Sequence, residues 1–248
     1  MSRIAPPSRA LRMPLALILS LIANGVQAAA PAPAPIQLAL YDPIQAVDSE
    51  RSVRGFRYSL IWGVNQDVSG LDLSTIASRA DGNVRGYQFA LFLNQVGGDF
   101  IGVQTGGLNI ARRGFTGLQF GFLGADTRGG PMRGVQFGLA GSFAEETAGV
   151  QFSLGGNDAT RVRGVQWGSF VNAAKDIKGV QAADLANVAE DMAGFQVAAL
   201  VNVAGQMKGL QIAALVNVAG QMKGLQLGLL NFNKNGFLPV FPLFNFGL

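Results

Sequence analysis

Glutamine and asparagine recur along this chain at a fixed spacing, and their side-chain amides are the first candidates for chemistry. A side-chain amide both donates and accepts hydrogen bonds. A row of such amides could line a neutral polar lumen that binds water or a small uncharged solute, or could form a structural hydrogen-bonded ladder. The candidate residues are Gln104, Gln119, Gln136, Gln151, Gln166, Gln181, Gln196, Gln211, Gln226, Asn172, Asn187, Asn202 and Asn217.

Catalytic and metal-binding chemistry has few suitable residues in this sequence. The chain contains no histidine and no cysteine, which removes the commonest general base, the commonest metal ligand and every nucleophile paired with histidine. Carboxylates such as Asp126, Asp158 and Asp176 lie in or near predicted turns, where they act as solvated turn formers. We therefore expect no enzyme activity, no cofactor and no metal site.

The first 35 residues have the composition of an export signal followed by a spacer. Residues 1–28 begin with a basic region that contains three arginines, continue with a short apolar run over 13–26 and end in small residues, which is typical of a secretory signal peptide. Residues 29–35 are an Ala/Pro linker of extended polyproline type. The whole sequence has 19 basic residues, and cleavage of the signal peptide would remove three of them. The remaining 16 basic residues nearly balance the 15 acidic ones, so the net charge does not favour a nucleic-acid partner.

Residues 36–248 are expected to form a single domain built on a 15-residue repeat. The stretches 194–208 (GFQVAALVNVAGQMK) and 209–223 (GLQIAALVNVAGQMK) are almost copies of each other. The same Gly-apolar-Gln opening starts ten units, with glycines at 86, 102, 117, 134, 149, 164, 179, 194, 209 and 224. Two degenerate units from 55 and 70 bring the number to twelve, with repeats ending near 238 and a closing segment over 239–248. A fixed period of this kind indicates a repeat architecture.

The pattern within one unit predicts a strand. With the glycine as position 1, positions 2 and 4 are apolar, position 3 is Gln, position 5 is small and position 9 is often Asn. This alternation places positions 2, 4, 6 and 8 on one face and positions 3, 5, 7 and 9 on the other. A helix is the alternative over the alanine-rich stretch 182–193, but the equivalent residues 136–143 are poor helix formers. In the two upstream units Arg57 and Asp72 occupy the Gln position, where we expect an ion pair between adjacent strands.

The preferred fold is an antiparallel up-and-down β-barrel of 12–14 strands. About ten strand residues tilted by about 40° span ~25 Å, the height of the apolar band of an outer-membrane barrel. The Gln rows would then face a lumen, and the Val, Leu and Phe rows would contact outer-membrane lipid. Phe244, Phe246 and Leu248 alternate as in the terminal strand of an exported barrel.

A β-solenoid with 15-residue coils is the alternative fold. The sequence has only 2 Trp and 3 Tyr for interfacial girdles, no stretch long enough for a large extracellular loop, and Asp184 on the face assigned to lipid. Stacked coils would instead align Gln on Gln and Asn on Asn. Pro239 and Pro242 would then belong to a cap that closes the stack.

The chain also resembles a bacterial family called surface repeat proteins. The matching stretches are 36–45 (IQLALYDPIQ), 55–63 (GFRYSLIWG), 69–73 (SGLDL), the Gly-Val/Leu-Gln array and 235–246 (NGFLPVFPLFNF), which together cover almost all of the chain after the linker. The resemblance implies a secreted or surface-exposed β protein. It brings no activity and no catalytic residue.

These observations predict an exported, non-enzymatic β-repeat protein in the outer membrane or at the cell surface of a Gram-negative bacterium. The preferred role is that of an outer-membrane barrel with a structural or passive-pore function. The alternative role is that of a secreted or surface-attached β-solenoid that acts as an interaction or binding module.

Overall fold

The computed structural model describes residues 31–248, so the predicted signal peptide over 1–28 and the first two linker residues lie outside the described residues. Pro33–Leu248 form one compact unit. The described part of the chain contains strands and turns, with no helix long and apolar enough to cross a membrane. The first strand begins at Ala34, two residues before the predicted start.

Sixteen strands form one continuous sheet that winds along the unit. They are β1 Ala34–Tyr41, β2 Ile44–Gln45, β3 Val53–Ser59, β4 Trp62–Asn65, β5 Val68–Ser74, β6 Ala77–Ala80, β7 Val84–Val96, β8 Asp99–Ala111, β9 Gly114–Gly138, β10 Gly141–Ser153, β11 Gly156–Gly168, β12 Val171–Ala183, β13 Ala186–Ala198, β14 Val201–Ala213, β15 Val216–Asn233 and β16 Val240–Gly247.

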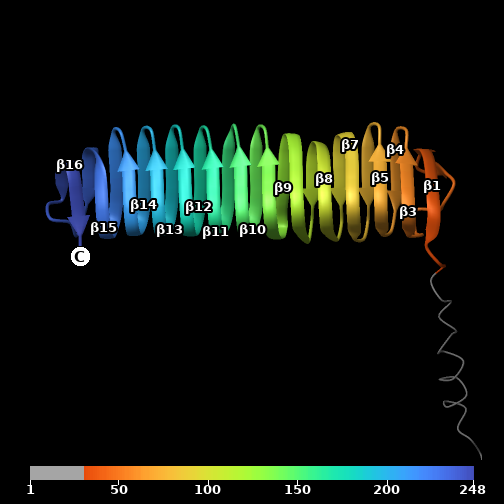
Figure 1. The fold of residues 1–248 in the computed structure, drawn as a ribbon, viewed down its shortest axis with the longest axis horizontal. Helices are drawn as coiled ribbons and strands as arrows, with labels where there is room; N and C mark the ends of the chain where they lie inside the picture. The colour runs from red at the N-terminus through yellow and green to blue at the C-terminus, as the bar shows by residue number, and fades with distance from the viewer. Residues whose placement is uncertain (1–30) are drawn as a thin grey trace, which may run out of the picture. The chain divides into compact units, whose positions relative to one another are not determined.

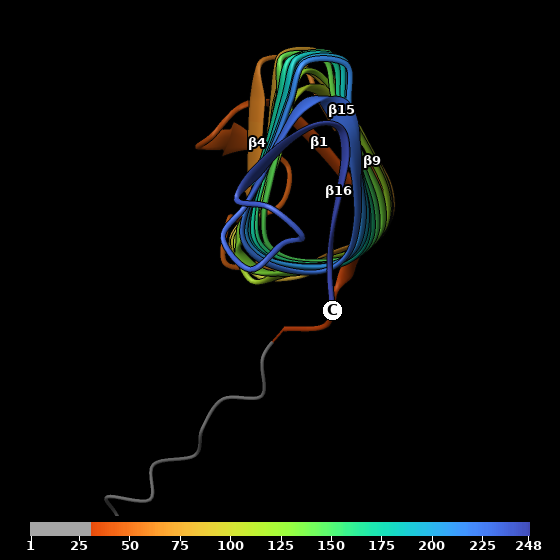
Figure 2. The same cartoon turned by 90° about the vertical axis from the view of Figure 1, so that its left-hand side faces the viewer.

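The sheet is a β-solenoid, and the prediction of an antiparallel barrel of 12–14 strands is wrong. Each long strand pairs in parallel with the next, so that β13 and β14 place Gly194 opposite Gly209 and Gln196 opposite Gln211. A residue therefore lies beside its equivalent 15 positions later, which requires the chain to go once around a coil rather than turn back. Figure 1 shows the coils stacked side by side, and Figure 2 shows their outlines superimposed along the stack. The predicted alternative, a solenoid with 15-residue coils, is confirmed.

The glycine at position 1 lets the chain bend within each coil. All twelve of these glycines have positive φ angles, between 121° and 143°. A Cβ atom at Gly209 would lie 2.1 Å from the carbonyl oxygen of Gly194 in the coil before it. Only glycine adopts this backbone conformation at this distance without strain. The repeated glycine is therefore a requirement of the coil geometry.

The interior of a coil is filled by one residue from each of five positions. In the coil that starts at Gly209 these are Gln211, Ala213, Asn217, Ala219 and Met222. The buried Ala, Val, Ile and Met side chains of successive coils form apolar clusters on one side of the interior. The amides of positions 3 and 9 and the small residue of position 5 form the rest of the core, and the apolar residues of positions 2 and 4 lie outside.

Position 7 faces outward, whereas the sequence pattern placed it inside with Gln and Asn. Leu200 and Leu215 occupy this position and are 39% and 44% exposed. The reason is a corner at positions 6 and 7, between the end of β13 at Ala198 and the start of β14 at Val201. Two consecutive outward residues at this corner interrupt the alternation.

The two ends of the stack depart from the parallel pattern. At one end β16 runs antiparallel to β15, with Pro242 opposite Leu230. Proline lacks the N–H group that a further strand would need, which suits an edge strand. At the other end the short strand β2 runs antiparallel to β1. The 17-residue unit that starts at Gly117 fits into the stack through a bulge in β9 between Thr127 and Pro131.

Candidate functional site

The predicted glutamines form one continuous hydrogen-bonded ladder inside the solenoid. From Gln104 to Gln226, each Nε2 donates to the Oε1 of the glutamine one coil earlier, at distances of 2.7–3.1 Å. All nine side chains are at most 1% exposed. Because they are packed against one another, they do not line a lumen that a solute could enter.

The ladder ends at a buried ion pair near the start of the stack. Gln88 donates to Asp72 at 2.8 Å, and the Arg57 guanidinium binds the same carboxylate with two hydrogen bonds of 2.7 and 2.6 Å. Both charged side chains are 0% exposed. Ser78 also donates to Asp72 at 2.7 Å, and Arg57 donates to the carbonyl oxygen of Arg79 at 2.8 Å. The predicted ion pair between adjacent strands is confirmed, and its carboxylate accepts the last amide donor of the ladder.

The predicted asparagines form a second ladder that runs in the opposite direction. Asn172, Asn187, Asn202 and Asn217 each donate to the Oδ1 of the asparagine one coil later, at 2.9–3.0 Å. The same amide groups donate to a main-chain oxygen ten residues on, as Asn187 does to Val197 at 2.6 Å. The side-chain dipoles of the two ladders therefore oppose each other.

Among the described residues, the buried amide oxygens without a partner lie at ladder ends, and the other partner-free buried atoms are four hydroxyl oxygens and the side-chain nitrogen of Asn233. Gln226 Oε1 lies at the last coil of the Gln ladder, and Asn157 Oδ1 lies at the first coil of the main Asn ladder. A directional chain of donors leaves one acceptor unused at one end, so these atoms follow from the ladder geometry. The candidate residues that the sequence supplied are thus brought together, but as part of the core.

The outer surface has an extended apolar region, which we call the apolar side. It consists of the residues at positions 2, 4, 6, 7, 8 and 10 of the coils that start at Gly164, Gly179, Gly194 and Gly209, continued by Leu225, Leu227, Leu229 and Leu230. All of these side chains are exposed or half-buried. Among them only Asp184 is charged and only Ser169 carries a hydroxyl group. The alternation in the sequence already placed positions 2, 4, 6 and 8 on one outward face, and it missed position 7, which the corner turns outward.

A row of stacked aromatic rings extends the apolar side toward the middle of the solenoid. Phe120, Phe137, Phe152 and Trp167 occupy position 4 of successive coils, with ring centroids 4.5, 5.0 and 4.2 Å apart. Their planes are within 18° of parallel. The row gives the solenoid a straight, half-exposed ridge of ring edges.

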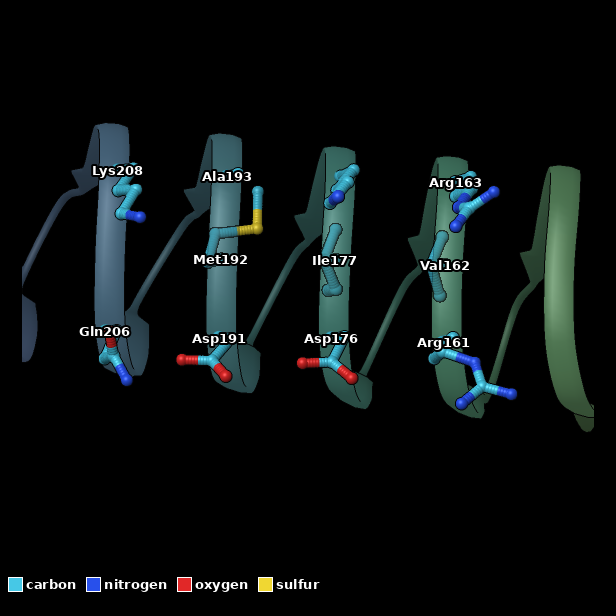
Figure 3. A pocket seen from close by; sticks show the side chains of 11 residues that line it. Arg161, Val162, Arg163, Asp176, Ile177, Asp191, Met192, Ala193, Gln206 and Lys208 are labelled. Carbon is cyan, nitrogen blue, oxygen red and sulfur yellow. The ribbon is translucent and has the colours of Figure 1, made fainter.

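The charged residues of these coils gather on a separate surface, which we call the polar strip. It comprises positions 12, 13 and 15, that is Thr160, Arg161, Arg163, Lys175, Asp176, Lys178, Glu190, Asp191, Ala193, Gly205, Gln206, Lys208, Gly220, Gln221 and Lys223. A shallow groove of about 400 Å³ runs along it. Figure 3 shows Asp176 and Asp191 on one row of this groove and Arg163 and Lys208 on the other.

The acidic side chains of residues 31–248 are dispersed along the stack. No group of three or more acidic side chains in this part of the chain could hold a metal ion. Burial disfavours the ionised form of Asp126, but hydrogen bonds from the side chain and main chain of Arg128 outweigh it and hold the pKa of this carboxyl below its ordinary value. Asp126 and Arg128 therefore form an ion pair in which the ionised carboxylate is favoured.

Comparison of the chain with protein-family models, with curated proteins and with solved structures finds no match, so the function must be argued from the geometry of the chain itself.

Proposed function

We propose that this chain is an exported, non-enzymatic β-solenoid that acts as an interaction module and binds its partner through the apolar side. The observation that carries this proposal is the continuity of the apolar side, in which Asp184 is the single charged residue. Five coils at about 4.8 Å and nine residues at about 3.3 Å give it an area on the order of 700 Å². Exposed apolar patches above a few hundred Å² mark interaction sites.

The construction of the core supports this role. Main-chain ladders and the Gln ladder connect successive coils, and the Asn ladder adds a second row of bonds from Asn157 to Asn231, so the outer residues are presented on a rigid frame. A surface that is ordered before binding loses little conformational entropy when the partner arrives. Repeat proteins use such extended surfaces for recognition.

A passive pore is not proposed, because the amides that would line it are packed as ladders. Export and a place at the cell surface are part of the proposal, and they rest on the signal-peptide pattern of residues 1–28 and on the resemblance to surface repeat proteins. The absence of histidine and cysteine from the sequence supports a non-enzymatic role.

Retention on the cell envelope tests the proposal. The chain is produced with its leader in a Gram-negative bacterium as the unchanged protein, as Leu200→Gln with Leu215→Gln on the apolar side, and as Gln206→Ser with Gln221→Ser on the polar strip of the same coils. We expect the unchanged chain and the polar-strip variant to stay with the envelope, and the apolar-side variant to appear in the medium. Equal retention of all three, or failure of the unchanged chain to leave the cytoplasm, would contradict the proposal.

A further inference from the structure

We infer that the partner of the apolar side is a lipid surface that carries anionic headgroups, and that a row of cations beside the apolar side binds those headgroups. This inference rests on the proposed function and names its partner. The row, which we call the cation row, consists of Arg163, Lys178, Lys208 and Lys223.

The cation row is straight and lies along the border of the apolar side. Its members occupy position 15 and are exposed. The strand register places Arg163 beside Lys178 and Lys208 beside Lys223, with Ala193 between the two pairs. Figure 3 shows Arg163, Ala193 and Lys208 on the same row of the groove. Only the glycine of position 1 separates each cation from the first apolar row at position 2.

The cations of the row take part in no ion pair that the described residues form. The ion pairs of residues 31–248 join Arg57 to Asp72, Arg79 to Asp81, Arg128 to Asp126 and Arg161 to Glu146. Beside Lys208 and Lys223, the neighbouring positions hold glycine and glutamine where the preceding coil has Glu190 and Asp191. These two lysines are therefore left without an acidic neighbour on their own coils.

Lys208 and Lys223 also face each other on adjacent coils, about 4.8 Å apart along the stack. Like charges directly opposite one another destabilise a sheet. Anionic groups bound between or above the two lysines would remove this repulsion. A partner that carries closely spaced negative charges therefore fits this edge of the apolar side.

The depth of the cation row relative to the apolar side matches a lipid interface. Positions 15 and 2 are two residues apart, or about 6–7 Å along the strand. Amphipathic segments that lie on membranes bury their apolar face by about 5–10 Å, with lysine and arginine at headgroup level. If positions 2 and 4 lie among the acyl chains, the flexible cation side chains reach the headgroups. Asp176 and Asp191, at position 13, are a further two residues away from the lipid.

The chemistry of the apolar side favours lipid over a protein partner. Protein interfaces carry about one hydrogen bond per 100–200 Å². In the two coils that start at Gly194 and Gly209, the apolar side contains only Ala, Val, Leu, Ile and Phe side chains, with nothing to donate or accept. Its main-chain groups are used in the parallel ladder. The surface also wraps around the corner at Leu200 and Leu215, which suits a fluid partner.

Vesicle flotation with the purified full chain tests the inference. The unchanged protein, Lys208→Gln with Lys223→Gln, and Leu200→Gln with Leu215→Gln are mixed with vesicles of phosphatidylcholine alone or with 30% phosphatidylglycerol. Arg112→Gln with Arg113→Gln removes the same charge from two exposed residues elsewhere and is the matched control. Circular dichroism and the thermal transition establish that each variant is folded.

We expect the unchanged protein and the control to float with the acidic vesicles and to bind neutral ones at least tenfold more weakly. Each lysine near an acidic surface contributes about fivefold in affinity, so the lysine variant should lose on the order of 30-fold on acidic vesicles. The leucine variant should bind neither vesicle. Equal binding to both vesicles, or an equal loss in the arginine control, would overturn the cation row.

The same experiment separates this inference from the proposed function. Sedimentation of the vesicle-free protein reports self-association. If the protein does not float but forms a dimer that Leu200→Gln with Leu215→Gln dissociates, the apolar side is an interaction surface for a second copy, and the lipid inference is wrong. If the protein neither floats nor associates, and the leucine variant also behaves as the unchanged chain on cells, both the inference and the proposed function are wrong.

Discussion

Gln211 donates its side-chain amide to the Oε1 atom of Gln196, one coil earlier in the chain, at 2.7 Å. Asn202 donates in the opposite direction: its side-chain amide donates to the Oδ1 atom of Asn217, one coil later, at 3.0 Å. Two buried amide ladders of opposite polarity therefore run through the solenoid. The ladders supply hydrogen-bond partners for the buried amides. They also fix which residue of one coil lies on which residue of the next.

The Gln ladder is expected to contribute to stability at each step. Gln196→Leu removes one acceptor for Gln211 and one donor for Gln181, so a buried oxygen is left without its partner. We expect a loss of about 1–3 kcal/mol in the free energy of unfolding. Urea unfolding of this variant is compared with Gln206→Leu, the same change at an exposed position of strand β14, which should change stability by less than ~0.5 kcal/mol. Equal effects would show that the ladder does not stabilise the fold.

The glycine at position 1 is expected to tolerate no side chain. Gly209→Ala combines a φ angle of 134° with a Cβ atom 2.1 Å from the oxygen of Gly194. We expect the variant to lose at least about 3 kcal/mol of stability or to fail to fold. Gly124→Ala is the control, because that glycine has no positive φ angle and its Cβ would meet the nearest atom at 3.2 Å. A Gly209→Ala variant as stable as the control would contradict the coil geometry.

We expect that one coil can be removed without loss of the solenoid fold. Deletion of residues 209–223 joins Lys208 to Gly224 and keeps each inward residue in register, because β14 and β15 pair at a spacing of 15. The shortened chain should keep its strand content and unfold in one transition at a slightly lower temperature. Deletion of 210–223, which is 14 residues, shifts every later side chain by one position and should yield a chain with disturbed ends. Identical circular dichroism and melting of the two deletions would disagree with the solenoid register.

We expect that two glutamines can replace the buried ion pair at the start of the Gln ladder and extend the ladder by two steps. Asp72→Asn leaves the buried Arg57 guanidinium without its counter-charge, which costs about 3–5 kcal/mol. The double change Arg57→Gln with Asp72→Gln gives both positions the residue that later coils use, so most of that stability should return. Thermal unfolding of the single and double variants checks this. A double variant as unstable as the single one would show that the charges have a role the ladder cannot replace.

Much of the solenoid could be predicted from the sequence, because the repeat length and the alternation of polar and apolar residues can be read directly from it. The 15-residue spacing, the strand alternation and the inward direction of residues such as Gln196 and Asn202 all follow from the repeat. The choice between barrel and solenoid did not, because in both folds residues i and i+15 can share one face of adjacent strands, and the repeat does not state whether those strands run parallel or antiparallel. The deciding feature is the parallel pairing of successive strands, in which Gly194 lies opposite Gly209, and the direction of a neighbouring strand is not written in the residue types.

The candidate site could be predicted only in part, for a related reason. The amide rows were visible as a spacing, but their burial depended on the coils closing around them. The outward direction of positions 2, 4, 6 and 8 followed from the alternation, but that of position 7 did not, because Leu200 and Leu215 lie at a corner that interrupts the period of two. A pattern of alternate residues assigns such leucines to the interior, although the chain turns there and points them outward.

The measurement that tests the account most directly uses the absence of cysteine from the chain. Leu215→Cys on the apolar side and Gln221→Cys on the polar strip of the same coil each provide one site for an environment-sensitive fluorophore. Addition of acidic vesicles should shift the emission of the label at 215 to shorter wavelength and leave the label at 221 unchanged. A shift at 221 alone, equal shifts at both sites, or no shift at either would contradict an apolar side that lies on lipid.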